Sequence, residues 1–281
     1  GYAITCYNGK ISFGGQFTVA GTVPANNIAS YDPATGVWSA LGSGTNGEIH
    51  ALTVRGAELI AGGLFTQAGG TAASNIARWN GTAWQSLGSG TNAEVNALTL
   101  FGGDLIAGGE FGNAGGVSVS NIARWDGNAW YALGAGVYGG SGDHVSAVIS
   151  LGSNLYAAGR FTNAGSGTSI NIAGWNGTSW FQMSSNTNER LYSLGIHNGE
   201  LYAGGGFTII GGITARYLAK WNGSTWTETG GGVEDEVNGI TSYKGELVVS
   251  GYFKHAGPEV NPVYVDRIAK FNGTAWQRML T

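Results

Sequence analysis

The sequence predicts an all-β chain, a six-bladed β-propeller with four-stranded antiparallel blades. Two observations carry this prediction. A Gly-Gly-x-Phe-like motif, with Ala-Gly or Ser-Gly in two copies, recurs six times at intervals of 46 to 50 residues, and no stretch of ten or more residues shows helical periodicity. Four short strands repeated every 40 to 50 residues or so are typical of propeller blades. The motif phenylalanines are Phe17, Phe65, Phe111, Phe161, Phe207 and Phe253.

The third repeat illustrates the four expected strands, at residues 95–100, 105–109, 122–125 and 130–133. The first strand carries uniformly small residues, as an inner strand crowded by its neighbours requires: Ala3, Ala51, Ala97, Ala147, Ser193 and Gly239. Two aromatic columns on the third and fourth strands are expected to fill the space between blades. The columns are Tyr31, Trp79, Trp125, Trp175, Trp221 and Phe271, and Trp38, Trp84, Trp130, Trp180, Trp226 and Trp276. Because these columns contain every tryptophan, core packing is favoured over sugar stacking for all ten.

An Asn-Gly or Asp-Gly pair separates the third and fourth strands in five repeats, as in Asn80-Gly81. The pair predicts a tight hairpin turn, because both residues accept a positive φ. The repeats fall at residues 1–44, 45–90, 91–136, 137–185, 186–232 and 233–281, and together they predict a single propeller domain. Aligning the two ends places the last blade beside the first, with ring closure by packing or by a strand swap between the terminal blades.

The composition excludes several classes of protein. A single cysteine excludes a disulfide framework and a Cys-rich metal site. The net charge of −4, without clustered Lys or Arg, predicts no nucleic-acid partner, and the apolar runs are too short for membrane insertion. Charged residues make up only 11% of the chain, and this low charge with little lysine favours an extracellular or cell-surface location. We expect a monomeric domain within a larger protein.

Glycines on the second strand, an aromatic residue on the third and tryptophan on the fourth resemble the kelch repeat, most closely at residues 31–38. The register that contains Asn-Ile-Ala-Arg-Trp is also similar to repeats of secreted bacterial surface proteins and fungal cortical polarity-marker proteins. These resemblances cover essentially the whole chain and imply the propeller fold, which hosts many functions. The WD40 pattern fits less well, because Trp-Asp occurs only once, at Trp125-Asp126.

Acidic residues recur in the loops before the first strands. They occur in Gly47-Glu48, Ala93-Glu94, Asp143-His144, Glu189-Arg190 and Glu234-Asp235-Glu236. Carboxylates gathered on one ring would repel one another, and a cation such as calcium would relieve the repulsion. The candidate metal ligands are therefore Glu48, Glu94, Asp143, Asp235 and Glu236. Hydration at an open rim is the alternative, and it is favoured because calcium sites usually have tighter Asp/Asn spacing. No other cofactor is expected.

The third position of Gly-Gly-x-Phe varies while its neighbours repeat: Gln16, Leu64, Glu110, Arg160, Gly206 and Tyr252. In a propeller, the loops after the second strands share a face with the loops before the first strands. Variation within a fixed frame suits a ligand-binding surface, and it equally suits positions under no constraint. The long insert at residues 258–266 is expected to shape the same face. The candidate binding residues are Gln16, Glu48, Glu94, Glu110, His144, Arg160, Tyr252 and Tyr264.

These features favour a non-catalytic binding or adhesion propeller that recognises a protein or glycan partner on this face. Two alternatives stay open. One is a carbohydrate-active enzyme that uses two of Glu48, Glu94, Asp143 and Glu236 at a separation of about 5 to 10 Å. The other is a structural module of a larger surface protein. Copper chemistry is not supported, because Cys6 lies in a column that is expected to be buried and is read as core.

Overall fold

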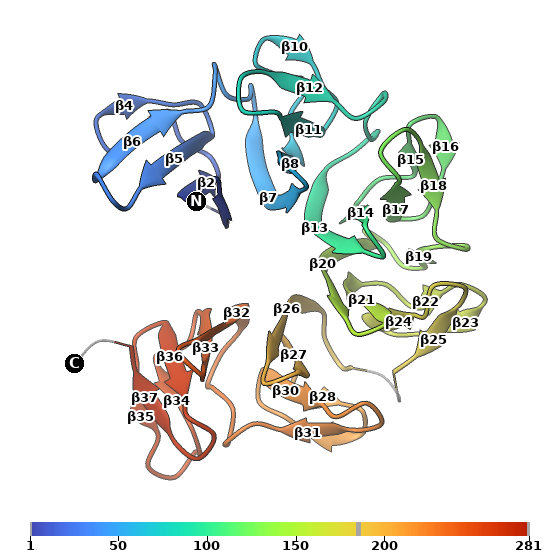
Figure 1. Ribbon diagram of the computed structural model, residues 1–281. Coiled ribbons are helices and arrows are strands. Elements are labelled where there is room, and N and C mark those ends of the chain that lie inside the picture. The colour runs from blue at the N-terminus through green and yellow to red at the C-terminus, as the bar shows by residue number, and fades with distance from the viewer. Residues whose placement is uncertain (1, 184–186, 280–281) are drawn as a thin grey trace. The chain divides into compact units, whose positions relative to one another are not determined.

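The computed structural model describes residues 2–183 and 187–279, and all regular elements in these residues are β-strands (Figure 1). Six four-stranded antiparallel sheets form six blades, and in each sheet the strands are ordered as they occur along the chain. The predicted all-β fold with six such blades is confirmed. The chain divides into two compact units, Gly1–Gly136 (unit 1) and Val137–Thr281 (unit 2), at a predicted repeat boundary. The expectations of a single domain and of a closed ring stay predictions.

Unit 1 holds the first three blades, drawn from blue to green in Figure 1. Blade 1 consists of β1 (Ala3–Tyr7), β2 (Lys10–Gly14), β5 (Ile28–Asp32) and β6 (Val37–Ala40). Blade 2 consists of β7 (Glu48–Arg55), β8 (Glu58–Leu64), β11 (Ile76–Trp79) and β12 (Trp84–Ser86). Blade 3 consists of β13 (Val95–Phe101), β14 (Asp104–Gly109), β17 (Ile122–Trp125) and β18 (Trp130–Ala132).

Unit 2 holds the other three blades. Blade 4 consists of β20 (His144–Leu151), β21 (Asn154–Arg160), β24 (Ile172–Trp175) and β25 (Trp180–Gln182). Blade 5 consists of β26 (Leu191–His197), β27 (Glu200–Gly205), β30 (Leu218–Trp221) and β31 (Trp226–Glu228). Blade 6 consists of β32 (Val237–Tyr243), β33 (Glu246–Gly251), β36 (Ile268–Phe271) and β37 (Trp276–Arg278).

A small hairpin, absent from the sequence-based expectation, lies between the second and third strands of every blade. The hairpins are β3–β4 (Val19–Ala20, Val23–Pro24), β9–β10 (Gln67–Ala68, Thr71–Ala72), β15–β16 (Asn113–Ala114, Val117–Ser118), β22–β23 (Asn163–Ala164, Gly167–Thr168), β28–β29 (Ile209–Ile210, Ile213–Thr214) and β34–β35 (His255–Ala256, Val263–Tyr264). In blade 4, β19 (Val137–Tyr138) adds a third strand to the hairpin. Strands of two residues give too short an alternation of apolar and polar positions for detection from sequence.

Within each unit the first strands of successive blades lie side by side: β1 beside β7 and β7 beside β13 in unit 1, and β20 beside β26 and β26 beside β32 in unit 2. The glycine pair on the second strand makes this packing possible. A Cβ atom on Gly62 would lie 2.6 Å from Val95 of the next blade, and one on Gly63 would overlap the Glu48 carbonyl of its own blade. Each glycine therefore has a separate steric reason, one between blades and one within a blade.

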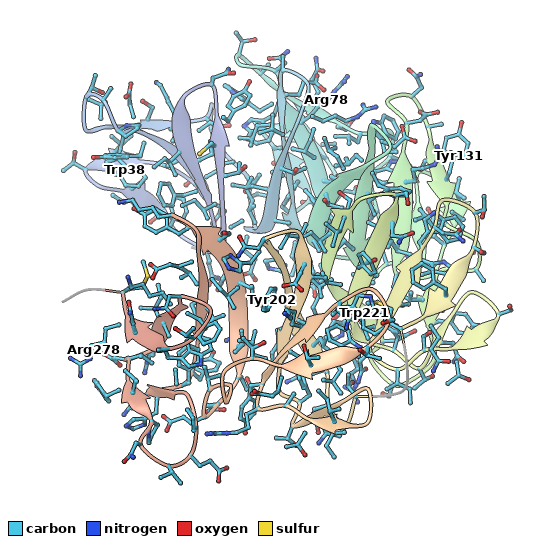
Figure 2. The ribbon with its side chains drawn as sticks, turned by 60° about the horizontal axis from the view of Figure 1, so that its bottom comes forward. Trp38, Arg78, Tyr131, Tyr202, Trp221 and Arg278 are labelled. Carbon is cyan, nitrogen blue, oxygen red and sulfur yellow. The ribbon has the colours of Figure 1, made fainter. Side chains whose placement is uncertain are left out.

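The tryptophan columns form the core, as predicted. The buried tryptophans of unit 1 include Trp79, Trp84, Trp125 and Trp130. In unit 2, Trp221, which is labelled in Figure 2, is also buried. Tryptophans on the fourth strands also donate an indole N–H to the preceding blade. These bonds are Trp84 Nε1 to Leu41 O (2.8 Å), Trp130 Nε1 to Leu87 O (2.9 Å), Trp226 Nε1 to Met183 O (3.3 Å) and Trp276 Nε1 to Gly230 O (2.9 Å). Burial and the indole bond together fix neighbouring blades.

The turn between third and fourth strands differs from the predicted two-residue hairpin. Trp79 pairs with Trp84, so the loop has four residues, and only Gly81 has a positive φ (100°). The Asn80 side chain instead accepts hydrogen bonds from the backbone N–H groups of Thr82 and Ala83, both at 2.9 Å. Asparagine closes the turn with its side chain here, and this removes the need for a left-handed backbone at that residue.

The expectation that Cys6 is core is wrong, because its side chain is exposed. Cys6 lies on β1, and the equivalent Val54 packs against the cluster that blade 1 and blade 2 share. Ile4, on the same face, is also exposed, at 63%. Alignment with buried columns in other repeats therefore misleads at a terminal blade.

Candidate functional site

A β-bulge at the start of the first strand creates the positions that carry the candidate sites. In five blades the pairing of first and second strands skips one residue, as between Ile49 and Ala51 in blade 2. The skipped residues are His50, Asn96, Ser146, Tyr192 and Asn238. A bulge bends its strand and redirects the side chain that it carries. The polar residues at this position therefore lie beside the loops that precede the first strands.

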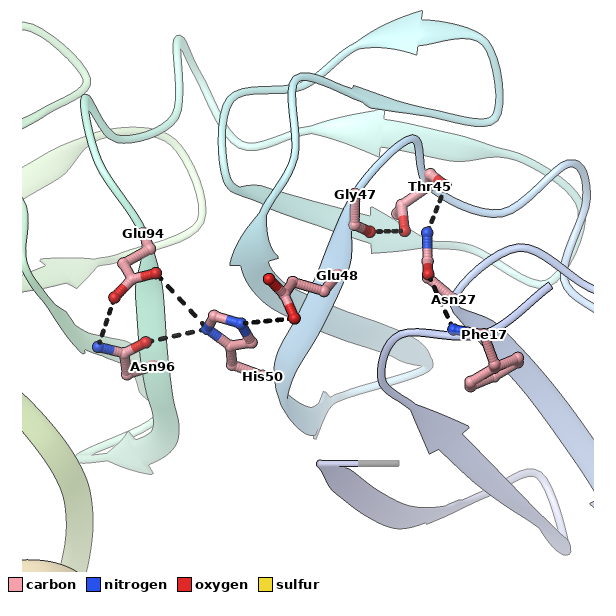
Figure 3. A network of polar contacts seen from close by, with 8 residues as sticks. All are labelled: Phe17, Asn27, Thr45, Gly47, Glu48, His50, Glu94 and Asn96. Carbon is pink, nitrogen blue, oxygen red and sulfur yellow. Dashed lines mark hydrogen bonds and ion pairs between the residues drawn. The ribbon is translucent and has the colours of Figure 1, made fainter.

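In unit 1 the bulge residues His50 and Asn96 contact two of the predicted acidic residues, Glu48 and Glu94 (Figure 3). We call these four residues the His50 network. His50 Nε2 lies 3.7 Å from Glu48 Oε2, and His50 Nδ1 lies 3.0 Å from Asn96 Oδ1 and 4.0 Å from Glu94 Oε2. Asn96 Nδ2 donates to Glu94 Oε1 at 3.5 Å. The histidine thus stands between carboxylates of neighbouring blades.

An asparagine clamp holds the loops that carry these residues. Asn27 has a left-handed backbone (φ 63°), accepts a hydrogen bond from Phe17 N at 3.2 Å and donates to Thr45 O of the next blade at 2.9 Å (Figure 3). Thr45 in turn donates to the Gly47 carbonyl at 2.7 Å. Equivalent left-handed asparagines are Asn75, Asn121 and Asn171. Asparagine suits the position because it tolerates this conformation and bonds locally.

Unit 2 contains a polar pocket of about 770 Å³. Its walls come from three neighbouring blades, with Arg160 at the end of β21, the loop Glu189-Arg190 before β26, and the loop Asp235-Glu236 before β32. Tyr192 of β26 and Tyr217 also line it, together with Gly139, Gly140 and Ser141 from the loop between β19 and β20. We call this cavity the unit 2 pocket.

A hydrogen-bonded chain fixes the centre of the pocket. Arg190 Nε donates to the Tyr192 hydroxyl at 2.8 Å, and that hydroxyl donates to Glu236 Oε1 at 3.0 Å. The bond to Tyr192 raises the pKa of the Arg190 guanidinium. Burial raises the pKa of the Tyr192 hydroxyl, with the Glu236 bond adding to the effect and Arg190 opposing it. Both groups therefore keep their protons at neutral pH, and the chain joins a cation to an anion through a neutral phenol.

The pocket lies where the repeat pattern breaks. Blade 5 places Arg190 where blades 2, 3 and 6 have glutamate, and Tyr217 where blades 1 to 4 have the clamp asparagine. Gly206 occupies the variable position that carries a side chain in every other blade, and a Cβ there would lie 3.5 Å from both Glu236 Oε1 and the Tyr192 hydroxyl. The four-residue excess of the blade 4 repeat also falls at the rim. Departures scattered along the sequence thus converge on one cavity.

The structure brings together three of the predicted residues, Arg160, Asp235 and Glu236, in the unit 2 pocket. Glu48 and Glu94 share the His50 network of unit 1. Asp143 and His144 secure the rim loop, because Gly139 N donates to Asp143 Oδ2 at 3.1 Å and His144 Nδ1 lies 3.0 Å from Gly142 O. The other predicted residues at the variable position, Gln16, Glu110 and Tyr252, are exposed and do not line the pocket.

The insert at 258–266 is expected from the sequence to shape the binding face. Its residue Tyr264 lies elsewhere, against the outer strand of blade 6. This residue lies in β35, pairs with His255 and contacts the outer strand β37, where its carbonyl accepts a bond from Arg278 Nε at 2.7 Å. The Arg278 guanidinium also lies over the Tyr264 ring at 5.0 Å. Tyr264 therefore does not line the unit 2 pocket.

Sequence reasoning missed Tyr192 and Tyr217 as pocket residues. The signal that identifies them is a departure from the repeat at an otherwise polar or asparagine position.

Among the described residues, no group of three or more His, Cys, Asp or Glu side chains is placed to hold a metal ion, and calcium binding stays a prediction. Over those same residues no helix is long and apolar enough to cross a membrane.

Comparison with known proteins assigns the fold. The chain is similar to the WD40 β-propeller domain of Doa1, with 12% identity and a TM-score of 0.62 over 99% of this chain and 82% of that one. It is also similar to the computationally designed Ika8 protein, with 13% identity and a TM-score of 0.53 over 98% and 94%. No protein-family model and no curated protein sequence matches. The chain is therefore a six-bladed β-propeller, and the likenesses support this fold and not the kelch class in particular.

Proposed function

We propose that this chain is a non-catalytic binding propeller of an extracellular or cell-surface protein, and that the unit 2 pocket recognises its protein or glycan partner. The resemblance of the sequence repeats to those of secreted bacterial surface proteins and the low content of charged residues support the location. The propeller is a fold typical of binding scaffolds, whose loops carry the ligand contacts on a rigid frame. The contacts to the partner are assigned to the unit 2 pocket.

One observation carries the proposal, namely the empty side-chain position at Gly206. The backbone there does not need glycine, because Gly206 has no positive φ and an added Cβ would meet its neighbours at ordinary contact distances. The absent side chain instead leaves space against Tyr192 and Glu236, at a position where other blades carry residues as large as Tyr252. A concave polar site lined by convergent charged groups is typical of ligand binding.

Gly206→Gln tests the proposal, because glutamine is the residue of blade 1 at this position and would place a side chain beside Tyr192 and Glu236 without backbone strain. Leu64→Gln is the matched control, since Leu64 is the exposed equivalent in unit 1. We would screen the purified chain against immobilised neutral, carboxylated and sulfated glycans and against short peptides. The expected result is a ligand whose binding is lost in Gly206→Gln and unchanged in Leu64→Gln. Equal binding by both variants would contradict a role for the pocket.

A carbohydrate-active enzyme is the second candidate, because three carboxylates, Glu189, Asp235 and Glu236, line the same cavity. Glycoside hydrolysis needs two such groups on either side of the scissile bond. The raised pKa of Tyr192 disfavours a phenolate nucleophile next to Glu236. Release of reducing sugar from the glycans that bind, abolished in Glu236→Gln while binding persists, would establish this alternative and overturn the non-catalytic proposal.

A further inference from the structure

We propose that the unit 2 pocket binds the terminal neutral sugar of a glycan, with Gly206 as the position that sets access. This inference rests on the pocket being the binding site, as proposed above, and names the class of ligand. It follows from the balance of charge in the lining, from the donors and acceptors left without partners, and from the shape that the missing side chain creates.

The charges of the lining nearly cancel. Two guanidinium groups, Arg160 and Arg190, face three carboxylates, Glu189, Asp235 and Glu236. A polyanion such as a sulfated glycan or a nucleic acid would meet these carboxylates, and a polycation would meet the guanidinium groups, so like-charge contacts would weaken both. An uncharged polar ligand meets neither repulsion.

The lining offers hydrogen-bond donors and acceptors side by side. Tyr192 occupies Arg190 Nε and Glu236 Oε1. Across residues 2–183 and 187–279, no hydrogen bond or ion pair is made by the terminal nitrogens of Arg190, by Glu236 Oε2 or by the Arg160 guanidinium. Each sugar hydroxyl both donates and accepts a hydrogen bond, so neighbouring hydroxyls satisfy an adjacent cation and carboxylate together.

The hydrogen-bonded chain also orients these groups before a ligand arrives. Arg190 lies over the Tyr192 ring, with its guanidinium carbon 5.1 Å from the ring centroid, so stacking and the Nε bond restrict the side chain together. Groups held in place lose less conformational entropy on binding, which matters for ligands whose contacts are individually weak.

The shape fits a small polar ligand better than an apolar one. The volume of about 770 Å³ lies in the range of small-molecule sites, which is about 300 to 1,000 Å³. Phe161 lines the cavity but is only 1% exposed, so its ring offers little apolar area to a lipid or a hydrophobic peptide, and half-buried Ile170 is the aliphatic residue of the lining. Tyr192 and Tyr217 are half-buried and also line the cavity, with Arg190 over one face of the Tyr192 ring.

The test is isothermal titration calorimetry of the full chain with methyl glycosides of glucose, galactose and N-acetylglucosamine, the matching uronates, and a Gly-Ser peptide. We expect at least one neutral glycoside to bind at least tenfold more tightly than its uronate. Gly206→Gln should abolish this binding, and Glu236→Gln and Arg190→Lys should each weaken it about tenfold. Leu64→Gln should leave it unchanged, and thermal melts would establish that every variant is folded.

Other outcomes separate the two proposals. Tighter binding of a uronate or of the peptide, lost in Gly206→Gln, would overturn the neutral-sugar inference and leave the pocket as the binding site. Binding that is unaffected by Gly206→Gln would contradict the proposed function as well. Failure of all three glycosides to bind at millimolar concentration would also overturn the neutral-sugar inference, whatever the wider glycan and peptide screen finds.

Discussion

The loops before the first strands have the same backbone design in both units but different side-chain chemistry. In unit 1 the bulge residues His50 and Asn96 bind the neighbouring carboxylates, and the clamp asparagines Asn27 and Asn75 tie each loop to the preceding blade. In unit 2 the bulge residue Tyr192 joins Arg190 to Glu236 at the edge of an open pocket. In unit 1 the histidine and asparagine of the bulges lie against the neighbouring carboxylates, whereas in unit 2 the bulge residue Tyr192 lines an open cavity.

In a repeat protein, positions that recur in every blade and positions that do not recur are expected to serve different purposes, stability for the first and binding for the second. Residues that recur in every blade serve the contact between blades, and they carry no information about a ligand. Residues that break the recurrence lower the stability of the fold. Tyr217, for example, has a left-handed backbone (φ 63°) at the position where Asn75 has the same φ without strain. A cluster of such departures around one cavity is therefore the strongest indication of function in this chain.

The largest loss of stability is expected when a buried tryptophan between blades is removed, and the loss should be similar in both units. Trp130→Ala in unit 1 and Trp226→Ala in unit 2 remove a buried indole that also bonds a carbonyl of the preceding blade. We expect each to lower the free energy of unfolding by about 3 to 5 kcal/mol, measured by denaturant titration. A loss below about 1 kcal/mol in one unit alone would break the comparison, because the frames would then not be equivalent.

Asn75→Tyr transfers the residue of blade 5 to unit 1. It forces a bulky residue into a left-handed backbone and removes the hydrogen bond from Asn75 Nδ2 to Thr91 O (2.9 Å). We expect a loss of about 1 to 3 kcal/mol in the free energy of unfolding. Asn75→Gly is the control, since it also loses this hydrogen bond but accepts the left-handed backbone without strain. Full stability of Asn75→Tyr would show that the clamp does not hold the loop.

The reverse change, Tyr217→Asn, restores the repeat in unit 2. Relief of the left-handed backbone should raise the free energy of unfolding by about 1 kcal/mol. For a chain of this size that corresponds to a rise of about 2 to 4 °C in Tm. Ligand binding in the unit 2 pocket should weaken at the same time, because the Tyr217 ring is lost from the lining. Higher stability with undiminished binding would mean that Tyr217 is not a ligand contact.

His50→Ala should have a smaller effect, of at most about 1 kcal/mol, because the side chains of the His50 network are partly exposed. The substitution leaves the carboxylates of Glu48 and Glu94 without the group between them. A double-mutant cycle with Glu48→Gln measures the contribution of that contact. A coupling energy above about 2 kcal/mol would show that the network supports the frame more strongly than its exposure implies.

The smallest expected effect is that of calcium. His50 already lies between Glu48 and Glu94, so we expect thermal melts in a chelator and in excess calcium to differ by less than about 1 °C. Saturating calcium at a hundred times its dissociation constant would instead stabilise the fold by about 2.7 kcal/mol. A shift of that size, abolished in Glu48→Gln, would establish the metal site that the acidic residues suggest.

Part of the candidate site was predictable from the sequence. Arg160, Asp235 and Glu236 were identified because variable and acidic positions stand out against a regular repeat. Tyr192 was not, because its role depends on a β-bulge that single-residue patterns do not reveal. The burial of Cys6 is also mispredicted, because the equivalent Val54 packs against the core cluster of unit 1 whereas Cys6 is exposed.

The sequence alone predicts the four main strands of each blade, the six blades and the tryptophan core, because periodic glycine and tryptophan positions encode contacts that every blade repeats. It predicts neither the small hairpins nor which polar residues meet. Tyr192 and Glu236 are 44 residues apart and belong to neighbouring blades, and their hydroxyl–carboxylate bond of 3.0 Å depends on how β26 and β32 pack. Non-repeating side chains meet through the register and bulge of neighbouring strands, and no local pattern specifies that geometry.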